Sequence, residues 1–337
     1  MIAGDRRIRT AADSRSGQLH HLVNGNDVYE TSPKVNSGLE PVQRGTAPLG
    51  LARPTRSDFV DGAQTTTNRG FYGKRAAPSQ LVRFLYWIYE RRLLHQIERR
   101  SLPRHIGIIL DGNRRHGRRR GLGDPREIYQ CGADKLNDVL DWCAEVGINA
   151  VTLWVFSTEN FKRSQSEVSG ILGAIEAKIL ALAYDPFMRE KRVRVRAIGR
   201  LDILPESVVS AMRAAEAATA QHDSMTLTIA AAYGGREEIV DAVCKFLKAE
   251  AKQGASLTDV INRLTSDAIG RHLYAADLPD PDLIIRTSGE IRLSGFLLWQ
   301  SVHSEFYFTD VLWPDFRKVD LLRAIRAYQE RNRRFGR

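Results

Sequence analysis

Residues 105–121 have the sequence HIGIILDGNRRHGRRRG, in which an apolar run ends at Asp111 and a turn rich in glycine and arginine follows. The run at 106–110 shows no alternation of polar and apolar side chains, which is typical of a parallel β-strand buried on both faces. Asp111 would then stand at the carboxyl end of that strand. This segment therefore predicts a strand, a loop and the start of a helix.

The loop after this strand has the features of a phosphate-binding turn. In open α/β sheets, ligands bind outside the carboxyl ends of the strands, where a following helix directs free backbone N–H groups outward. Gly112 permits close approach of the backbone, Asn113 can cap the helix, and five arginines offer planar donors for phosphate oxygens: Arg114, Arg115, Arg118, Arg119 and Arg120. A lone carboxylate among them suits Mg²⁺, which takes one or two carboxylates together with substrate phosphates.

The composition restricts the possible functions but does not select one of them. The chain has 337 residues, 43% of them apolar, which is enough for a sizeable core, and a net charge of +10. That charge predicts an acidic partner, namely a phosphorylated substrate, an anionic membrane surface or nucleic acid. The loop alone leaves the same choice open, because Asp111 could merely cap a helix and the arginines could form a solvated face or a nucleic-acid patch.

Cysteine usage and hydropathy bear on location. Cys131, Cys143 and Cys244 are widely spaced, odd in number and form no C-x-x-C pattern, which indicates a reducing compartment and no zinc site. The sequence contains no apolar run of roughly 18 residues, the length that a membrane span requires. We therefore expect a cytoplasmic protein, with contact at the inner face of the membrane as an option.

Three regions differ in composition. Residues 1–78 are rich in Gly, Ser, Thr, Asn, Pro and Arg, and are expected to be a disordered extension. Residues 79–100 have apolar side chains at helical spacing among many arginines, which predicts a basic amphipathic helix. That helix could dock on an anionic membrane, but packing onto the following domain is the preferred interpretation. Residues 101–337 are expected to form a single folded domain.

Within that domain, short apolar runs alternate with helical patterns. This alternation predicts an α/β fold with a mainly parallel central sheet flanked by helices. Further strands are expected at 150–156, 193–199, 226–235, 282–286 and 304–310. Helices are expected at 131–146, after Ser164, after Pro205, from Arg236 to about Tyr274, and at 318–334.

Several of the predicted strands end in polar or charged residues. The carboxyl ends of parallel strands lie at one edge of a sheet, so these residues should gather there. The groups are Asp111 to Arg115, then Ser157 to Asn160, then Gly234 to Arg236, then Arg286 to Ser294. A basic, hydroxyl-rich edge beside long apolar helical stripes indicates a substrate with a diphosphate at one end and a hydrocarbon at the other.

Four motifs, taken together and in order, carry a family resemblance: HIGIILDGNRR, FSTENFKRSQSEV, AAYGGREEIVDAV and DLIIRTSGEIRLSGFLLWQSVHSEFYFTDVLWPDF. The chain from about Pro103 onward resembles the cis-prenyltransferases, or Z-isoprenyl diphosphate synthases, of the undecaprenyl diphosphate synthase type. The resemblance implies a homodimeric, Mg²⁺-dependent enzyme that joins isopentenyl diphosphate to an allylic diphosphate. Each condensation in this family creates a cis double bond.

The same resemblance implies roles for individual residues. Asp111, Asn113 and Asn160 match catalytic positions, and Asp111 and Glu305 match positions that ligate Mg²⁺. The implied substrate-binding residues are Gly112, Arg115, Arg119, Ser157, Glu159, Phe161, Arg163, Arg236, Arg286, Arg292 and Ser294. The mechanism needs little proton chemistry from the protein, since arginines and Mg²⁺ would stabilise the departing diphosphate.

The chain departs from the family pattern at several positions. His116, Phe161, Ala232 and Gly295 replace residues that are common in the family, and Tyr129 stands where many members carry His. A tyrosine is a poor base at neutral pH because its ordinary pKa is about 10. These changes spare the charged residues, so they bear on loop closure, proton handling and product length rather than on the reaction class.

Product length depends in this family on the depth of a tunnel between sheet and helices. Val155 and Met225 fall at positions that resemble tunnel walls, and Val155 is larger than the Ala of long-chain members. We therefore expect a short or medium product. Two other classes stay open, namely a catalytically silent partner subunit of a heteromeric prenyltransferase and a basic nucleic-acid-binding protein. Retention of the charged and hydroxyl anchors argues against the first: Asp111, Arg286, Arg292 and Ser294. The lack of nucleic-acid motifs argues against the second.

Overall fold

The computed structural model describes residues 80–332. The expected disordered extension at 1–78 lies outside these residues, and no structural statement about it follows. The helices are α1 Gln80–Gln96, α2 Asn113–Arg120, α3 Pro125–Val146, α4 Gln165–Tyr184, α5 Pro186–Glu190, α6 Glu206–Ala218, α7 Gly235–Lys252, α8 Leu257–Arg263, α9 Ser266–Gly270 and α10 Lys318–Asn332. Short 3₁₀ turns are found at Arg99–Ser101, Thr158–Lys162, Leu201–Ile203 and Trp313–Asp315.

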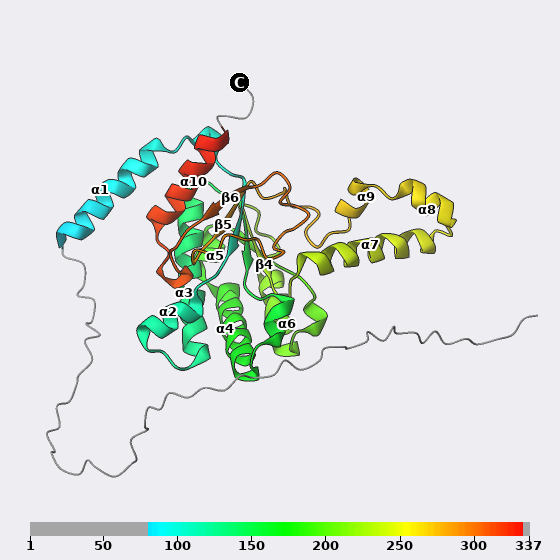
Figure 1. The fold of residues 1–337 in the computed structure, drawn as a ribbon, viewed down its shortest axis with the longest axis horizontal. Coiled ribbons are helices and arrows are strands. Elements are labelled where there is room, and N and C mark those ends of the chain that lie inside the picture. Colours follow the sequence, from blue (N-terminus) through cyan, green and yellow to red (C-terminus); the bar gives the residue numbers. More distant parts are fainter. Residues whose placement is uncertain (1–79, 333–337) are drawn as a thin grey trace, which may run out of the picture. The chain divides into compact units, whose positions relative to one another are not determined.

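A six-stranded, all-parallel sheet forms the centre of the fold (Figure 1). Its strands are β1 His105–Ile109, β2 Ala150–Trp154, β3 Val193–Ile198, β4 Met225–Ala230, β5 Leu283–Arg286 and β6 Glu305–Phe308. They lie in the order β3-β4-β2-β1-β5-β6, and every neighbouring pair is parallel. The predicted mainly parallel α/β sheet is therefore confirmed, and β1 occupies an interior position as its unbroken apolar run indicated.

Helices and a long loop segment cover the two faces of the sheet. Alternate side chains of the strands, such as Ile106 and Ile108, pack with α3, α4, α6 and α10 in the main core. The helices α3, α4 and α6 lie side by side in Figure 1 and pack on one another in that order. The opposite face packs against Phe296 and Leu297. Gly107 permits Phe296 to pack closely on the sheet, because a Cβ at residue 107 would lie only 2.9 Å from Cε1 of Phe296.

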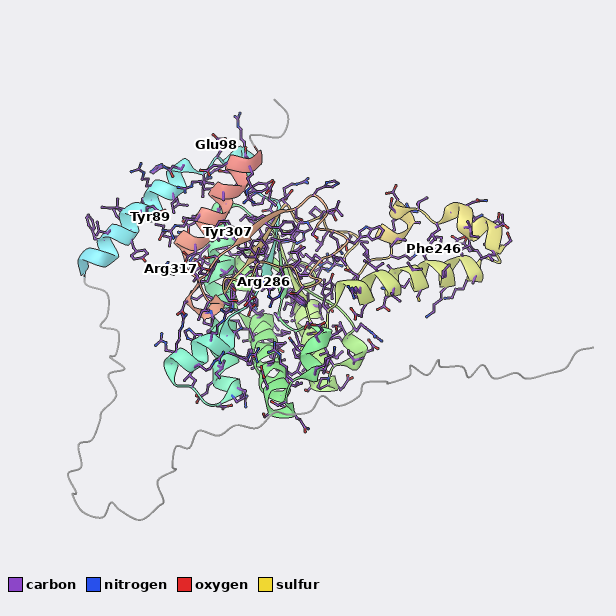
Figure 2. All side chains as sticks on the ribbon, in the orientation of Figure 1. Tyr89, Glu98, Phe246, Arg286, Tyr307 and Arg317 are labelled. Atoms are coloured by element: carbon purple, nitrogen blue, oxygen red, sulfur yellow. The ribbon has the colours of Figure 1, made fainter. Side chains whose placement is uncertain are left out.

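The helical stretch expected from Arg236 to about Tyr274 consists of three helices, α7, α8 and α9. Gly254 interrupts it with a φ of +70°, a left-handed conformation that favours glycine, and α8 follows after a Ser256 capping box. Phe246, Val260 and Ala268 form a small cluster among α7, α8 and α9. Figure 2 labels Phe246, which belongs to α7. Sequence periodicity missed the break because α8 and α9 are only one to two turns long.

The amphipathic segment forms α1 and ends at Gln96, a few residues earlier than expected. Its carboxyl half packs on α10: Leu93 is fully buried, Glu90 pairs with Lys318 at 2.8 Å, and Arg323 donates to the Tyr89 hydroxyl at 3.1 Å. Figure 2 labels Tyr89 on this helix. The preferred interpretation, packing onto the domain, is confirmed for this half. Across residues 80–332, no helix combines the length and apolarity needed to cross a membrane.

The amino edge of the sheet is fixed by a buried histidine. His105 Nδ1 donates to the carbonyl of Pro279 at 2.6 Å, so Nε2 accepts from the hydroxyl of Thr152 at 2.8 Å. The carboxylate of Asp282 accepts from the backbone N–H of Arg104 and His105 at 2.7 and 3.1 Å. Burial lowers the pKa of His105, which keeps the ring neutral in this network.

Candidate active site

A polar cleft of about 550 Å³ lies at the carboxyl edge of the sheet. It is formed where β1, β2 and β5 end, and these strands are neighbours in the sheet. Most of the residues predicted from sequence line it: Asp111, Gly112, Asn113, Arg115, Ser157, Glu159, Asn160, Arg163, Arg286, Arg292 and Ser294. Strand direction thus brings together segments that are up to about 180 residues apart in the chain.

Asp111 is held in the cleft by its backbone. Its N–H donates to Thr287 Oγ1 at 3.0 Å, and the Thr287 hydroxyl lies 2.7 Å from the Asp111 carbonyl. The same carbonyl accepts from the N–H of Trp313 at 3.0 Å. Gly112 follows with a φ of +109°, which turns the chain into α2. The loop after β1 is therefore clamped to the loop after β5 before any side chain is considered.

Arg286 spans the cleft from the end of β5. Its Nη2 donates to Asp111 Oδ2 at 3.0 Å, and its Nη1 donates to Ser294 Oγ at 2.9 Å and to the carbonyl of Arg292. Figure 2 labels Arg286 in the centre of the fold. The side chain is only 6% exposed, whereas that of Asp111 is 34% exposed. A buried guanidinium thus fixes one side of a carboxylate whose remaining surface faces the cleft.

The other cationic groups of this side are Arg115 of α2 and Arg292 in the loop after β5. Arg115 donates to Ser288 Oγ at 2.6 Å and lies 3.6 Å from Glu290, which also pairs with Arg292. Ser288 and Ser294 both adopt positive φ values, of 80° and 54°, which non-glycine residues rarely adopt. Such strained conformations cluster at functional sites, where surrounding contacts enforce them. Both strained serines accept hydrogen bonds from the arginines of the cleft.

The loop after β2 forms the opposite wall. Ser157 and Asn160 make a reciprocal capping box, in which the Asn160 side chain accepts from the Ser157 N–H at 3.1 Å. This explains the spacing of the two residues without reference to a ligand, although both face the cleft. Arg163 ends this segment and donates to Glu167 at 2.7 Å and to the Tyr129 hydroxyl at 2.9 Å.

Tyr129, Arg163 and Glu167 form a linked group that Arg114 joins as a fourth residue and third charge, 3.5 Å from Glu167. The Tyr129 hydroxyl donates to Glu167 at 2.9 Å. Burial raises the pKa of Tyr129 to about 12, with Arg163 opposing the rise. Burial alone would raise the pKa of Glu167, but hydrogen bonds from Tyr129 and the charge of Arg163 lower it overall. Tyr129 is therefore a hydrogen-bond donor near neutral pH and not a base.

A second, apolar pocket of about 70 Å³ adjoins the cleft between the sheet, α3 and α4. Five residues line both spaces: Leu110, Asn113, Tyr129, Val155 and Ile171. The expected tunnel-wall role of Val155 is consistent with this position. Met225, the other suggested wall residue, is buried in the core and does not line the pocket. The site as a whole is a charged cleft that continues into an apolar one.

Three predicted substrate-binding residues do not line the cleft. Arg119 is exposed on α2; each residue turns a helix by about 100°, so Arg118 faces the cleft and its neighbour does not. Phe161 packs edge-on against Phe156, with ring centroids 4.9 Å apart. Arg236 is exposed at the start of α7, outside the cleft. The quoted motifs contain Phe161 and Arg236 and the arginine-rich loop suggested Arg119, but none of the three lines the cleft.

Glu305 is placed at the wrong edge of the sheet to share a metal with Asp111 of the same chain. It opens β6 beside Leu283 at the amino end, its N–H donates to the carbonyl of Asp282, and its carboxylate pairs with Arg331 at 3.0 Å. Asp111 follows the carboxyl end of β1. Parallel strands separate these ends by the length of a strand, so the predicted pairing of the two carboxylates does not occur within one chain.

Two lining residues had no individual role in the sequence prediction. Arg118 was one of the five loop arginines suggested for phosphate, and helical spacing singles it out, since it lies four residues after Arg114 on the same face of α2. Glu290 had no assigned role. It lies between Arg115 and Arg292, and fixes the direction of both guanidinium groups.

The residues fit a magnesium ion only if substrate supplies most of its ligands. No group of three or more His, Cys, Asp or Glu side chains within residues 80–332 could hold a metal. Asp111 offers a partly exposed carboxylate, and the Oδ1 atom of neighbouring Asn113 is buried without a hydrogen-bond partner. One carboxylate plus phosphate oxygens is the arrangement in which proteins commonly bind Mg²⁺.

Comparisons with known proteins define the family. Residues 109–336 match the family model described as "Putative undecaprenyl diphosphate synthase". The isoprenyl transferase of Deinococcus radiodurans is 55% identical over 254 residues, 75% of this chain and 92% of the relative. The (2Z,6E)-farnesyl diphosphate synthase of Thermobifida fusca is 49% identical over 252 residues, 75% of this chain and 97% of the relative.

A solved structure is similar to this chain in both fold and sequence. The lavandulyl diphosphate synthase of Lavandula x intermedia, crystallised in complex with dimethylallyl diphosphate, superposes with a TM-score of 0.62 at 34% identity. The match covers 68% of this chain and 96% of that one. A parallel α/β fold with a cationic cleft beside an apolar pocket is therefore that of a prenyl-transferring enzyme. The chain belongs to the undecaprenyl diphosphate synthase family, the cis-prenyltransferases that its motifs resemble.

Proposed function

We propose that this chain condenses isopentenyl diphosphate with an allylic diphosphate and releases a Z-polyprenyl diphosphate of short to medium length. The observation that supports this most directly is the continuity of the two spaces. Asp111, Arg286 and Ser294 lie in the cationic cleft, while Val155 lines both the cleft and the apolar pocket. A substrate with a diphosphate head and a hydrocarbon tail fits that combination, whereas a nucleic acid does not.

The chemistry assigned to the protein is electrostatic. As the allylic carbon–oxygen bond breaks, negative charge grows on the departing diphosphate, and Arg115, Arg114 and Arg118 face it from α2. Arg292 and Ser294 hold the second diphosphate, and Arg286 orients both Ser294 and Asp111. The two substrates then meet in fixed geometry, which converts a bimolecular reaction into an effectively unimolecular one. The isopentenyl double bond attacks the allylic carbon, and a proton is lost from the adduct.

Asp111 is the residue assigned to Mg²⁺ in this proposal, with diphosphate oxygens as the other ligands. When bound, the ion would neutralise diphosphate charge and so promote departure of the leaving group. Glu305 keeps a metal-binding role in the proposal only if it comes from a second chain, since its own Asp111 lies at the opposite edge. Asn113 and Asn160 are assigned to positioning beside Asp111 and Ser157.

Three further assignments belong to the proposal. Residues 101–337 act as one catalytic domain, as the family match at 109–336 suggests. The enzyme works as a homodimer, which would cover apolar side chains exposed on α7 and α8: Val240, Leu247, Leu257 and Ile261. The protein acts in the cytoplasm, and α1 contacts the inner face of the membrane through Phe84, Leu85 and Trp87, each more than half exposed.

The test is a direct assay. Purified protein is incubated with radiolabelled isopentenyl diphosphate, Mg²⁺ and, separately, dimethylallyl, geranyl, farnesyl and geranylgeranyl diphosphate. We expect elongation of at least one primer, loss of elongation with EDTA, its recovery with added Mg²⁺, and none with Asp111→Ala. Absence of incorporation with every primer would overturn the proposal and favour the silent-subunit hypothesis.

A further inference from the structure

The wall of the apolar pocket contains one residue that does not suit a hydrocarbon. On α4, the pocket is lined by residues at helical spacing: Ile171, Ala174, Ile175, Lys178, Ile179 and Leu182. Lys178 is the only charged side chain among the residues that the structure places around this pocket. Lysine belongs on the solvent face of such a helix, so its place within the apolar stripe calls for an explanation.

Lys178 lies in the deeper half of this pocket. Ile171 lines both the cleft and the pocket, so it marks the entrance, and Leu182 lines the pocket only. Seven residues separate Ile171 from Lys178, which is about 10 Å along the helix axis at a rise of 1.5 Å per residue. A chain that grows from the cleft along α4 therefore passes Ala174 and Ile175 before it reaches Lys178.

The ammonium group is held between α3 and α4. Its Nζ donates to Asn137 Oδ1 at 2.9 Å, and Asn137 Nδ2 donates in turn to Asp185 Oδ2 at 3.2 Å. Burial lowers the pKa of Lys178, while the charges of Asp134, Asp185 and Asp138 act to raise it. The side chain therefore lines the pocket and has its polar end held by Asn137 of α3.

A hydrocarbon that advanced past this point would have to cover the ammonium group or displace it from Asn137. Covering a charge without giving it a new partner is strongly unfavourable, whereas burying further methylene groups against apolar walls is favourable. At Lys178, contact with the pocket wall therefore changes from favourable to unfavourable for a hydrocarbon chain. Val155 differs from Lys178 because it is apolar and lies where the cleft and the pocket meet.

We propose that Lys178 is a specificity-determining residue that limits product length: the growing prenyl chain stops where its end meets the ammonium group held by Asn137. This inference rests on the proposed condensation activity and adds a residue to it. A purely structural lysine would behave differently. Its removal would change stability and leave the product distribution as it was.

The experiment compares product lengths by reversed-phase chromatography after the diphosphates are hydrolysed to alcohols. Lys178→Met removes the charge and keeps an unbranched side chain of similar length, and Lys178→Ala also removes volume. Lys248→Met makes the same charge change at an exposed position on α7 that does not line the pocket. Substrate ratio and primer are identical for all proteins, and thermal unfolding establishes that each variant is folded.

We expect Lys178→Met to shift the main product by at least one five-carbon unit toward longer chains, with Lys178→Ala shifted as far or further. Lys248→Met should match the wild type. An unchanged or shortened distribution for both Lys178 variants, in proteins that still elongate, would overturn the role of Lys178 and leave the proposed function intact. No elongation by the wild type would overturn both.

Discussion

Arg286 at the end of β5 donates to the carboxylate of Asp111 at the end of β1, with Nη2 and Oδ2 separated by 3.0 Å. The two residues are 175 positions apart in the chain and meet because β1 and β5 are parallel neighbours. Arg286 is nearly fully buried and Asp111 is not. The arginine is thus a fixed part of the protein, and the aspartate is the member of the pair that can also reach a ligand.

Replacing Arg286 with lysine should damage substrate binding more than folding. A lysine keeps the charge but cannot donate at once to Asp111, Ser294 and the Arg292 carbonyl, as the guanidinium fork does. We expect kcat/KM for isopentenyl diphosphate to fall about 10²-fold, the loss typical of a misplaced electrostatic group. Steady-state kinetics measure this, with Arg213→Lys on the exposed face of α6 as control. Equal effects of the two variants would contradict the assignment.

Gly112 can be tested with a matched series of glycine-to-alanine variants. Gly112 has a φ of +109° and a Cβ would lie 2.9 Å from Leu312, Gly121 has a φ of +72° with open space, and Gly123 has open space only. A left-handed conformation costs alanine about 1–2 kcal/mol. Denaturant unfolding should therefore show the largest loss for Gly112→Ala, a smaller one for Gly121→Ala and little for Gly123→Ala. A different order would refute the steric argument.

Acid should destabilise the protein partly through Glu167. Because its pKa in the folded protein is lowered from the ordinary 4.5, its contribution to stability is complete above that pH and is lost as pH falls through the lowered value. Tyr129→Phe removes one of the hydrogen bonds responsible, so stability should vary less as pH falls below the ordinary pKa of 4.5. Thermal melts against pH give the comparison, with exposed Tyr184→Phe as control. Curves for Tyr129→Phe that run parallel to the wild type would exclude this contribution.

Val155 and Met225 should differ in their effect on product length. Val155 lines the junction of cleft and pocket, so Val155→Ala should widen it and lengthen the product. Met225 is buried away from the pocket, and Met225→Leu, a swap of similar volume, should cost less than about 1.5 kcal/mol of stability and leave the product unchanged. Chromatography of the products compares them. A longer product from Met225→Leu alone would reverse this assignment of the two residues.

Local patterns predicted the elements, and strand direction then decided which residues meet. The apolar runs located each strand to within a few residues. The signal is clearest for β1 and β5, which are buried throughout, because a parallel strand buried on both faces has little else in its sequence. Sheet order did not follow from these runs, since it depends on contacts between distant segments. Glu305 illustrates the limit: its motif suggested the site, but it begins a strand, whereas Asp111 follows one.

Side-chain direction within a helix was a second limit. Arg118 and Arg119 are adjacent and chemically identical. Only their angular positions around the axis of α2 determine that Arg118 lines the cleft and Arg119 does not. Lys178 went unnoticed for a related reason. A lysine in a helical pattern is ordinarily assigned to solvent, and only the packing of α3 on α4 reveals that this one faces the pocket.

The buried His105 at the amino edge of the sheet has a practical consequence. Its ring contacts Thr152 and Pro279, and its backbone N–H donates to the Asp282 carboxylate. These contacts join three neighbouring segments at the end of the sheet remote from the cleft. Engineering for heat tolerance and engineering for new products can therefore proceed on separate sets of positions. We expect substitutions around His105 to change the thermal stability of the enzyme, and substitutions around the cleft to change its products.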